Sequence, residues 1–502
     1  MKIRLPTSVQ NWISLIGLMI AFISLFIIVI LFVISNFLGQ GGLYLGLVTY
    51  ILLPALMMAG FFLIIIGMIT YTIRKRKEGK IRALGWPRVD LNLAKHRRAF
   101  FIFSGLTAFI LFISALGSYE AFHFTESVSF CGQLCHSVME PEYTAYQHTP
   151  HARVPCVECH VGPGADWYVR SKLSGLYQVY ATVTDKYPRP IPTPIENLRP
   201  AREVCEICHW PEQFYDYKIH FETYYLADKE NTEWNLRLIV KTGSEHPAMG
   251  LKEGIHWHIN PDVKIEYAAA DERREDIPWV RYTDLKTKEV IVFRSDGFDL
   301  ESGEMDNREI RTMDCIDCHN RASHNYKTPS RFVNTAMVAG KISSELPNIK
   351  SLIMGLCGEE YASKDEGLET LQNKIYGYYE KNYPEILSEK RDLVDRAVTE
   401  LQTLFSQNIF PKMKVRWDVH PNHIGHLDYK GCFRCHAGTL SSDEGPVVRH
   451  DCNLCHIITA QGTPPNLEVS EVRHPLEFKH PVDIDKAWKE MLCSECHQGA
   501  GQ

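Results

Sequence analysis

The N-terminal part of the chain lacks titratable side chains. No Asp, Glu, Lys, Arg or His occurs between Leu5 and Ile73, a stretch far longer than the roughly 20 apolar residues that cross a bilayer once. A polar, Gly-rich patch at 35–42 divides it, so we predict two spans, at about 12–36 and 45–72. A cleavable signal peptide is the alternative for the first span. An apolar run of this length, followed at once by a second span, does not fit one.

Histidine is absent from both spans and from a third apolar segment, Ala99 to Ser118. A pair of b-type haems buried in the bilayer, as in cytochrome b, would need histidine ligands there. We therefore predict three membrane spans that form an anchor without a redox centre of its own. Spans one and two could bind lipid, quinone or a partner, and the sequence does not choose between these.

Isolated cysteines are nearly absent as well. Of the 15 cysteines, Cys357 alone lies outside a close pair that is followed directly by His, and we expect it to be a buried thiol. Six pairs form CxxCH, the attachment signature of c-type haem, and the first forms CxxxCH. A disulfide framework, a zinc ribbon or a thioredoxin-like CxxC would not require His after every pair. The predicted haem sites, each with its cysteines and a histidine as iron ligand, are Cys131/Cys135/His136, Cys156/Cys159/His160, Cys205/Cys208/His209, Cys315/Cys318/His319, Cys432/Cys435/His436, Cys452/Cys455/His456 and Cys493/Cys496/His497.

No pair is followed by Lys, and histidine is plentiful, with 22 residues in the chain. Each CxxCH haem needs one further histidine to become six-coordinate, and the supply is large enough for every iron. A six-coordinate haem transfers electrons, whereas a reductase needs an iron that is open to substrate. This pattern favours electron transfer over a terminal reductase.

The charge distribution predicts the orientation. Segment 74–98 carries ten Lys or Arg and two acidic residues, and basic loops stay on the cytoplasmic side. The N-terminus, with Lys2 and Arg4, is then cytoplasmic, and span three leads to the periplasm of a bacterial inner membrane, where c-type haem is attached. Residues 1–98 sum to +10 within a chain of net charge −6, which leaves −16 for the rest. We expect this acidic part to attract basic patches of soluble partners; the alternative is that the charge serves solubility.

The order of motifs after span two resembles that of the NapC/NirT/NrfH family of membrane-anchored tetrahaem quinol dehydrogenases. The resemblance covers about 99–330. It rests on the anchor, a first haem motif with a following Met (Cys131–Met139), Glu142-Tyr143, His151 to His160, a helix with Lys172, Cys205–Trp210 and Cys315–His324. The CxxxCH spacing of the first motif departs from the family pattern.

The resemblance implies one further iron ligand for each of three haems. Met139 rather than His136 would be the protein ligand of the first haem, and thioether ligation tends to raise a haem potential. The alternative for Met139 is a loop residue that touches the haem edge. His324 would be the second ligand of the second haem, and His151 that of the fourth.

The resemblance also implies a quinol site near the first haem. Lys172 would face the quinol, and a solvated charge on an amphipathic helix is the alternative. Gln178 stands where the family has an acidic residue, so it takes the place of the expected proton acceptor.

Residues 211–314 form an insertion with strand-like runs at 234–241, 263–267, 279–282 and 290–293. His256 and His258 flank Trp257 on what reads as one strand, so their side chains would share a face. We expect one of them to ligate the third haem, with a two-histidine metal site as the alternative. His220 and His246 are less favoured.

Residues 331–414 contain no haem motif and read as a spacer, with helices at 368–379 and 386–407. The last three haems follow in 415–502. We expect His426 and His480 to be second ligands there, with His420 or His423 next. The remaining candidates are His450 and His474.

The predicted fold is mainly α, with extensive loops and a small β-containing insertion, packed around haems. The predicted segments are 1–98 with two transmembrane helices and a basic loop, 99–120 with the third span, 121–330 with a tetrahaem domain and its insertion at about 211–314, 331–414 as a helical spacer, and 415–502 as a trihaem domain.

We expect an inner-membrane heptahaem c-type cytochrome that oxidises menaquinol or ubiquinol and passes electrons to periplasmic c-type cytochromes. An anchor with seven haems resembles the ImcH-type cytochromes of metal-reducing bacteria, which implies a role in anaerobic respiration or extracellular electron transfer. The alternatives are a terminal reductase of a small oxyanion and a fixed subunit of a larger respiratory complex. The lipid bilayer is an expected partner, and nucleic acid is not.

Overall fold

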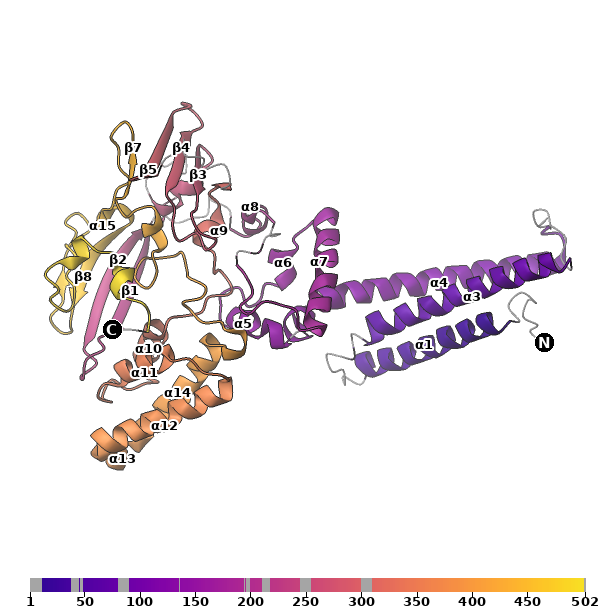
Figure 1. The fold of residues 1–502 in the computed structure, drawn as a ribbon, viewed down its shortest axis with the longest axis horizontal. Coiled ribbons are helices and arrows are strands. Elements are labelled where there is room, and N and C mark those ends of the chain that lie inside the picture. The colour runs from indigo at the N-terminus through magenta and orange to yellow at the C-terminus, as the bar shows by residue number, and fades with distance from the viewer. Residues whose placement is uncertain are drawn as a thin grey trace. The chain divides into compact units, whose positions relative to one another are not determined.

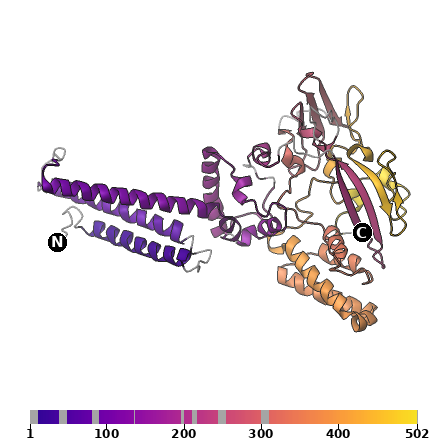
Figure 2. The same cartoon turned by 180° about the vertical axis from the view of Figure 1, so that it is seen from behind.

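The computed structural model describes residues 11–37, 45, 48–79, 90–134, 136–193, 195, 199–209, 217–243, 254–298 and 309–500. Cys135 and His246, and the side chain of His136, lie outside this part. The chain forms two compact units, Met1–Met139 and Glu140–Gln502, which are traced in Figures 1 and 2.

Three long helices make up most of the first unit: α1 (Trp12–Phe37), α3 (Leu53–Lys77), which continues the π-helical segment η1 (Val48–Leu52), and α4 (Ala94–Glu126). Each contains a stretch long and apolar enough to cross a membrane, at Trp12–Ile34, Val48–Lys77 and Ala94–Glu126. These helices contain nearly all of the three predicted spans. The helix α4 extends beyond 99–118 at both ends because no helix breaker stops it there.

Small residues bring α1 and α3 together. A Cβ atom added to Gly60 would lie 2.7 Å from the carbonyl oxygen of Gly17. The Ser14 hydroxyl donates to the Ile64 carbonyl (3.1 Å), and the Asn11 amide donates to the Gly67 carbonyl (3.2 Å). Close backbone approach and interhelical hydrogen bonds hold transmembrane helices together, because lipid supplies no hydrophobic drive between them.

The second unit contains two antiparallel sheets. The first has the order β1-β2-β8-β9, with β1 Tyr217–Tyr225, β2 Glu233–Lys241, β8 His456–Gly462 and β9 Glu468–Val469. The second has the order β6-β3-β4-β5-β7, with β3 Val263–Ala268, β4 Trp279–Asp284, β5 Val290–Ser295, β6 Ile310–Thr312 and β7 Leu440–Ser442.

Both sheets join the predicted insertion to the C-terminal part of the chain. Strand β8 pairs with β2, and β7 pairs with β5, as Figure 1 shows by the yellow strands beside the pink ones. The sheets of the predicted insertion therefore continue into C-terminal strands that were not predicted. Strand β7 has three residues and pairs with β5, which lies far away in the sequence, so it leaves little local signal.

After strands β1 to β6, the chain forms a helical part without a haem motif. Its helices are α10 (Pro329–Val338), α11 (Ile349–Gly358), α12 (Lys364–Asn382), α13 (Pro384–Glu389) and α14 (Arg391–Asn408). Its core includes fully buried Leu371, Leu401 and Phe405. Cys357 is fully buried as predicted. The single helix predicted at 386–407 is divided, because Lys390 has non-helical angles (φ −131, ψ 30).

The six CxxCH motifs lie on or beside short helical turns. The described cysteines of the six CxxCH motifs lie on or beside α6 (Cys156–His160), α8 (Ala201–Cys205), α9 (Cys315–Cys318), η7 (Gly431–Arg434), α15 (Cys452–Cys455) and α16 (Cys493–Cys496). The other helices of this region are α5 (His136–Gln147), α7 (Ala165–Val183), η4 (Ile255–Ile259), η6 (Pro411–Met413) and η8 (Ala487–Lys489).

Candidate functional site

Six pairs of histidine rings stand out in the second unit. Each pair joins the histidine of one CxxCH motif to a histidine from another segment. The ring centroids are 6.2 Å apart for His160/His324, 5.9 Å for His209/His151, 6.3 Å for His319/His256, 5.8 Å for His436/His258, 6.0 Å for His456/His426 and 6.0 Å for His497/His480.

This spacing fits an iron between the two rings of each pair. A metal–imidazole bond is about 2.0–2.1 Å long, so two rings on opposite sides of one ion have centroids roughly 6 Å apart. Direct stacking or a hydrogen bond between the rings would bring them closer. The donor set of two imidazoles beside a pair of cysteines is that of a six-coordinate c-type haem.

The second histidines present the nitrogen that a metal needs. In five of them the Nδ1–H group donates to a backbone carbonyl, so Nε2 is the ring nitrogen that would bind an iron between the two rings. A metal-ligating histidine characteristically donates its other ring N–H in this way. The hydrogen bonds run from His151 to Ala322 (3.2 Å), His256 to Thr242 (3.0 Å), His258 to Ile255 (2.7 Å), His324 to Glu142 (3.0 Å) and His480 to Val482 (2.8 Å).

Burial favours the neutral form of eight of the paired imidazoles by lowering their pKa. Burial, together with the neighbouring His160, lowers the pKa of His324 to about 4. Burial and the neighbouring His426 lower the pKa of His456 to about 4. A neutral imidazole is the form that binds a metal. Burial also lowers the pKa of His160, His256, His258, His319, His426 and His497.

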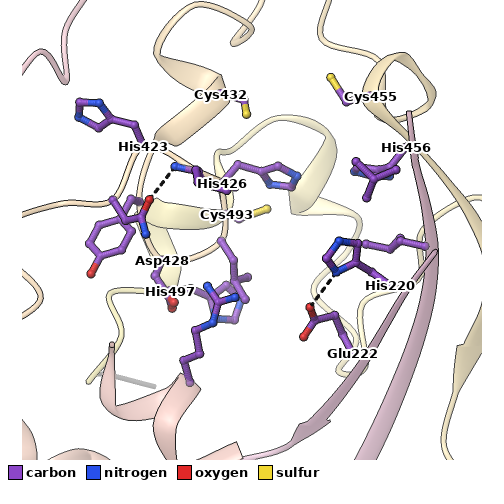
Figure 3. A pocket seen from close by; sticks show the side chains of 18 of the residues that line it. His220, Glu222, His423, His426, Asp428, Cys432, Cys455, His456, Cys493 and His497 are labelled. Atoms are coloured by element: carbon purple, nitrogen blue, oxygen red, sulfur yellow. Dashed lines mark hydrogen bonds and ion pairs between the residues drawn. The ribbon is translucent and has the colours of Figure 1, made fainter. Parts of the chain in front are cut away.

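Five of the six histidine pairs, all but His160/His324, line one large cavity. Its volume is about 2990 Å³, roughly three times the upper end of the 300–1,000 Å³ range of small-molecule pockets. Figure 3 shows part of it, where Cys432, Cys455 and Cys493 surround His426 and His456. A cavity of this size, lined by residues of all six CxxCH motifs, fits several macrocycles.

The pairing of His151 differs from the predicted one. Its ring lies opposite His209 of the third motif, not opposite His319 of the fourth. His324 faces His160 of the second motif, where the resemblance placed it.

The turn that carries His256 and His258 also differs from the prediction. Residues Ile255–Ile259 form a 3-10 helix rather than a strand. In a 3-10 helix, residues two positions apart point in different directions, so the two rings do not share a face. His256 lies opposite His319 of the fourth motif and His258 opposite His436 of the fifth, so neither faces the third motif.

Among the C-terminal candidates, His426 and His480 face the sixth and seventh motifs. His420 and His423 face no CxxCH histidine among the described residues, so His258 takes the place predicted for one of them. His423 is buried; its Nδ1–H donates to the Asp317 carbonyl (3.0 Å), and its Nε2 lies 3.1 Å from the Glu275 carboxylate. Its role is that of a structural hydrogen-bonding residue.

The aspartate inside the fourth motif positions that motif. Asp317 is 2% exposed. Its carboxylate accepts hydrogen bonds from the Tyr267 hydroxyl (2.6 Å), Arg311 Nε (2.7 Å) and the Asp314 amide (2.7 Å). Asp317 thus fastens α9 to strands β3 and β6, and the sequence pattern CIDC gave no sign of this role.

The first motif lies in the other unit. Cys131 is in the π-helical segment η2 (Phe130–Leu134). A π-helix closes each turn with more residues than an α-helix, which suits the extra residue of CxxxCH. Met139 follows in α5 and is half-buried.

The predicted quinol residues lie on different sides of α7. Val169, Leu173, Leu176, Tyr180 and Val183 form an apolar stripe along this helix, each more than 50% exposed. Lys172 borders the stripe, and its Nζ lies 4.9 Å from the centroid of the Tyr168 ring. At 100° per residue, Gln178 falls on the opposite side of the helix, where its amide donates to the Ser174 hydroxyl (3.5 Å). The structure does not bring Lys172 and Gln178 together.

Three apolar helices, repeated CxxCH motifs and a second histidine opposite each CxxCH histidine define a membrane-anchored multihaem cytochrome c. The signature of the NapC/NirT cytochrome c family, N-terminal region, matches residues 94–191. The cytochrome c-type protein ImcH of Geobacter sulfurreducens is 41% identical over 492 residues, which cover 98% of this chain and 96% of that protein. The chain therefore belongs to the NapC/NirT cytochrome c family and, within it, to the ImcH-type cytochromes.

A more distant relative matches only part of the chain. The cytochrome c-type protein NrfH of Wolinella succinogenes is 28% identical over 121 residues, which cover 23% of this chain and 68% of that protein. No solved structure gives a significant match. As a member of a cytochrome c family with membrane-spanning helices, the chain is a membrane protein that carries covalently bound haem and transfers electrons.

Proposed function

We propose that this protein oxidises membrane quinol and passes the electrons through seven covalently bound haems to periplasmic c-type cytochromes, in anaerobic respiration or extracellular electron transfer. The six histidine pairs are the observation that carries this proposal. With an imidazole on each side, the iron at every CxxCH motif has no position left for a substrate. Six-coordinate haems relay electrons between partners.

The residues that hold the haems follow from the motifs and the pairs. The cysteines of each motif would form the thioether bonds, and the paired histidines would ligate the iron of the second to seventh haems. At the first haem, Cys131 and Cys135 would make the attachment and Met139, rather than His136, would be the protein ligand. The bound haems supply reversible one-electron redox chemistry.

Helix α7 supports the quinol site. A helix with an exposed apolar stripe and bordering cations is typical of a segment that lies in the membrane–water interface. Its stripe at Leu173, Leu176 and Tyr180 offers a surface for lipid and for the apolar ring and tail of menaquinol or ubiquinol. We assign Gln178 no role in quinol binding, because it lies on the other side of the helix.

Lys172 acts on the quinol hydroxyl. Its ammonium group donates a hydrogen bond to the quinol oxygen and stabilises the negative charge that develops as the proton leaves. Oxidation of one quinol to quinone releases two electrons and two protons. The electrons leave singly to the first haem, whose motif follows the anchor directly in the sequence, and both protons pass to periplasmic water.

The charge of the chain supports an inner-membrane location with three spans. The basic segment 74–98 lies between spans two and three, and basic loops stay in the cytoplasm. The N-terminus is then cytoplasmic and the haem domains are periplasmic. A terminal oxyanion reductase is disfavoured because each CxxCH histidine has a second histidine opposite it.

The test is reduction of the purified protein by a reduced quinol analogue under anaerobic conditions. We expect haem reduction in the wild type and its loss in Lys172→Ala. The matched control is Lys381→Ala, because Lys381 is an exposed lysine in the last turn of another helix, α12, outside the proposed quinol surface. Equal rates in both variants would refute the role of Lys172. Co-purification of a stoichiometric catalytic subunit would instead indicate a fixed subunit of a larger complex.

A further inference from the structure

We propose that haem sites two to seven form one unbranched chain in the order of the sequence, with site seven as the exit. We further propose that the turn His256–His258 and the ring of Phe433 make two of its junctions. The direction of electron flow rests on the proposed function. The order of the sites rests on contacts between consecutive motifs.

Sites two, three and four follow one another through their attachment helices. Helix α6 contacts α8, and α8 contacts α9. Cys159 of site two lies within electrostatic reach of Cys205 and Cys208 of site three. The Ala201 amide, at the start of α8, donates to the carboxylate of Asp314 just before motif four (3.0 Å), which places sites three and four side by side.

Sites four and five are joined by one short turn. His256 faces the site-four histidine and His258 faces the site-five histidine, so two adjacent irons would take ligands from residues two positions apart. Trp257 between them stacks on Tyr282 of β4, with centroids 5.4 Å apart and an interplanar angle of 22°. This stacking fixes the turn against a rigid sheet.

A hydrogen bond also links the two attachment motifs. Arg434, between the cysteines of site five, donates through Nη2 to the carbonyl of Asp317, between the cysteines of site four (2.7 Å). Cys318 and Cys432 lie within electrostatic reach of each other. The tetrahaem and trihaem parts of the chain therefore meet at sites four and five.

Phe433 connects sites five and six. It lies between the cysteines of site five, and its ring stacks on His426, the second histidine of site six, with centroids 4.4 Å apart and an interplanar angle of 25°. Cys455 of site six lies within electrostatic reach of Cys432. An aromatic ring thus stands directly between the two haem sites.

Sites six and seven are adjacent through the segment that separates their motifs. Gln461, in the strand β8 that continues motif six, donates through its side-chain amide to the Glu477 carbonyl (2.7 Å). The ammonium of Lys489, just before motif seven, pairs with the carboxylate of the same Glu477. These contacts again join consecutive motifs, which leaves site seven at the end of the chain.

The experiment compares two full-length variants that each lose one haem. Cys432→Ala/Cys435→Ala removes site five, and Cys493→Ala/Cys496→Ala removes site seven; the mass of each purified protein confirms the loss. In the unbranched chain, loss of site five isolates sites six and seven. In stopped-flow reduction by quinol, only four of the six remaining haems should then be reduced in the fast phase, so roughly a third of the absorbance change should be missing from it. Loss of site seven should leave all remaining haems in the fast phase.

A second readout does not depend on quinol. Electron paramagnetic resonance of the oxidised proteins measures the magnetic coupling between neighbouring haems. Loss of site five should change the signals of its two neighbours, sites four and six. Loss of site seven should change the signal of site six alone. Full fast reduction without site five, or coupling changes in the opposite ratio, would overturn the proposal. If quinol reduces no haem in the wild type, the proposed function fails while the coupling data still decide the order.

The unmodified protein provides the check if the variants do not fold. An experimental map that resolves the irons gives their order directly. Nearest neighbours in the order two to seven support the proposal, and any nearest pair from non-consecutive motifs refutes it.

Discussion

Replacing His480 by Ala should open one haem. The His480 ring lies 6.0 Å from that of His497, and its Nδ1–H donates to the Val482 carbonyl at 2.8 Å. The nitrogen that faces His497 is therefore Nε2, and no other histidine of the described residues lies opposite His497. His480→Ala should leave the seventh iron with a single protein ligand.

The size of the effect follows from the number of sites. One haem among the seven motifs should change from low spin to high spin, so roughly one seventh of the iron changes state. By electron paramagnetic resonance, the oxidised variant should show a high-spin signal that exceeds the wild-type signal by about one haem per protein. The reduced variant should bind carbon monoxide at about one haem more than the wild type does. Haem content by mass should not change, because both cysteines of the site remain.

His474 provides a matched control. It precedes the same motif and is exposed, and from sequence alone it was a less favoured candidate for the seventh iron. His474→Ala should therefore have the same spin states as the wild type. A His480→Ala spectrum equal to that of the wild type, or an equal gain of high-spin signal in both variants, would refute the pairing of His480 with His497.

Three further outcomes follow from the structure. Asp317→Ala should lower the free energy of unfolding by about 3–5 kcal/mol, because it leaves the buried partners of the carboxylate unpaired, and a guanidinium denaturation midpoint measures this loss. Burial lowers the pKa of Lys350 from 10.5 to about 8, so the unfolded state binds more protons between these values and unfolding free energy should rise with pH there by up to about 3 kcal/mol. Denaturation of Lys350→Met at several pH values should show no such rise. Gly60→Leu should lower the melting temperature in detergent, since a Cβ there meets α1, whereas Gly105→Leu should not, because nothing lies within 4 Å of a Cβ at that position.

The CxxCH motifs are visible in the sequence because their signal is local. A CxxCH motif places both cysteines and the first ligand within five residues, and an apolar stretch marks a span by composition alone. The six histidines that lie opposite CxxCH histidines were all among the sequence candidates: His151, His256, His258, His324, His426 and His480.

The pairing of the ligands was not visible in the sequence because it depends on long-range packing. His258 meets His436 only because the turn Ile255–Ile259 is a 3-10 helix that sends His256 and His258 in different directions. A strand would have placed both on one face.

The contacts of two residues inside motifs were equally hidden. Asp317 and Phe433 occupy the variable positions between paired cysteines, where the motif tolerates any side chain. Asp317 gains its role from Tyr267 and Arg311 on two strands, and Phe433 gains its role from His426 of another loop. Neither partner set leaves a periodic signal.

Reduction of the wild-type haems by a membrane quinol tests the central claim most directly. The purified protein, oxidised and reconstituted in a lipid bilayer, is mixed anaerobically with menaquinol or ubiquinol, and the haem spectrum is followed. We expect the haems to become reduced, with one quinone formed for every two haems reduced. No haem reduction by either quinol would contradict the account.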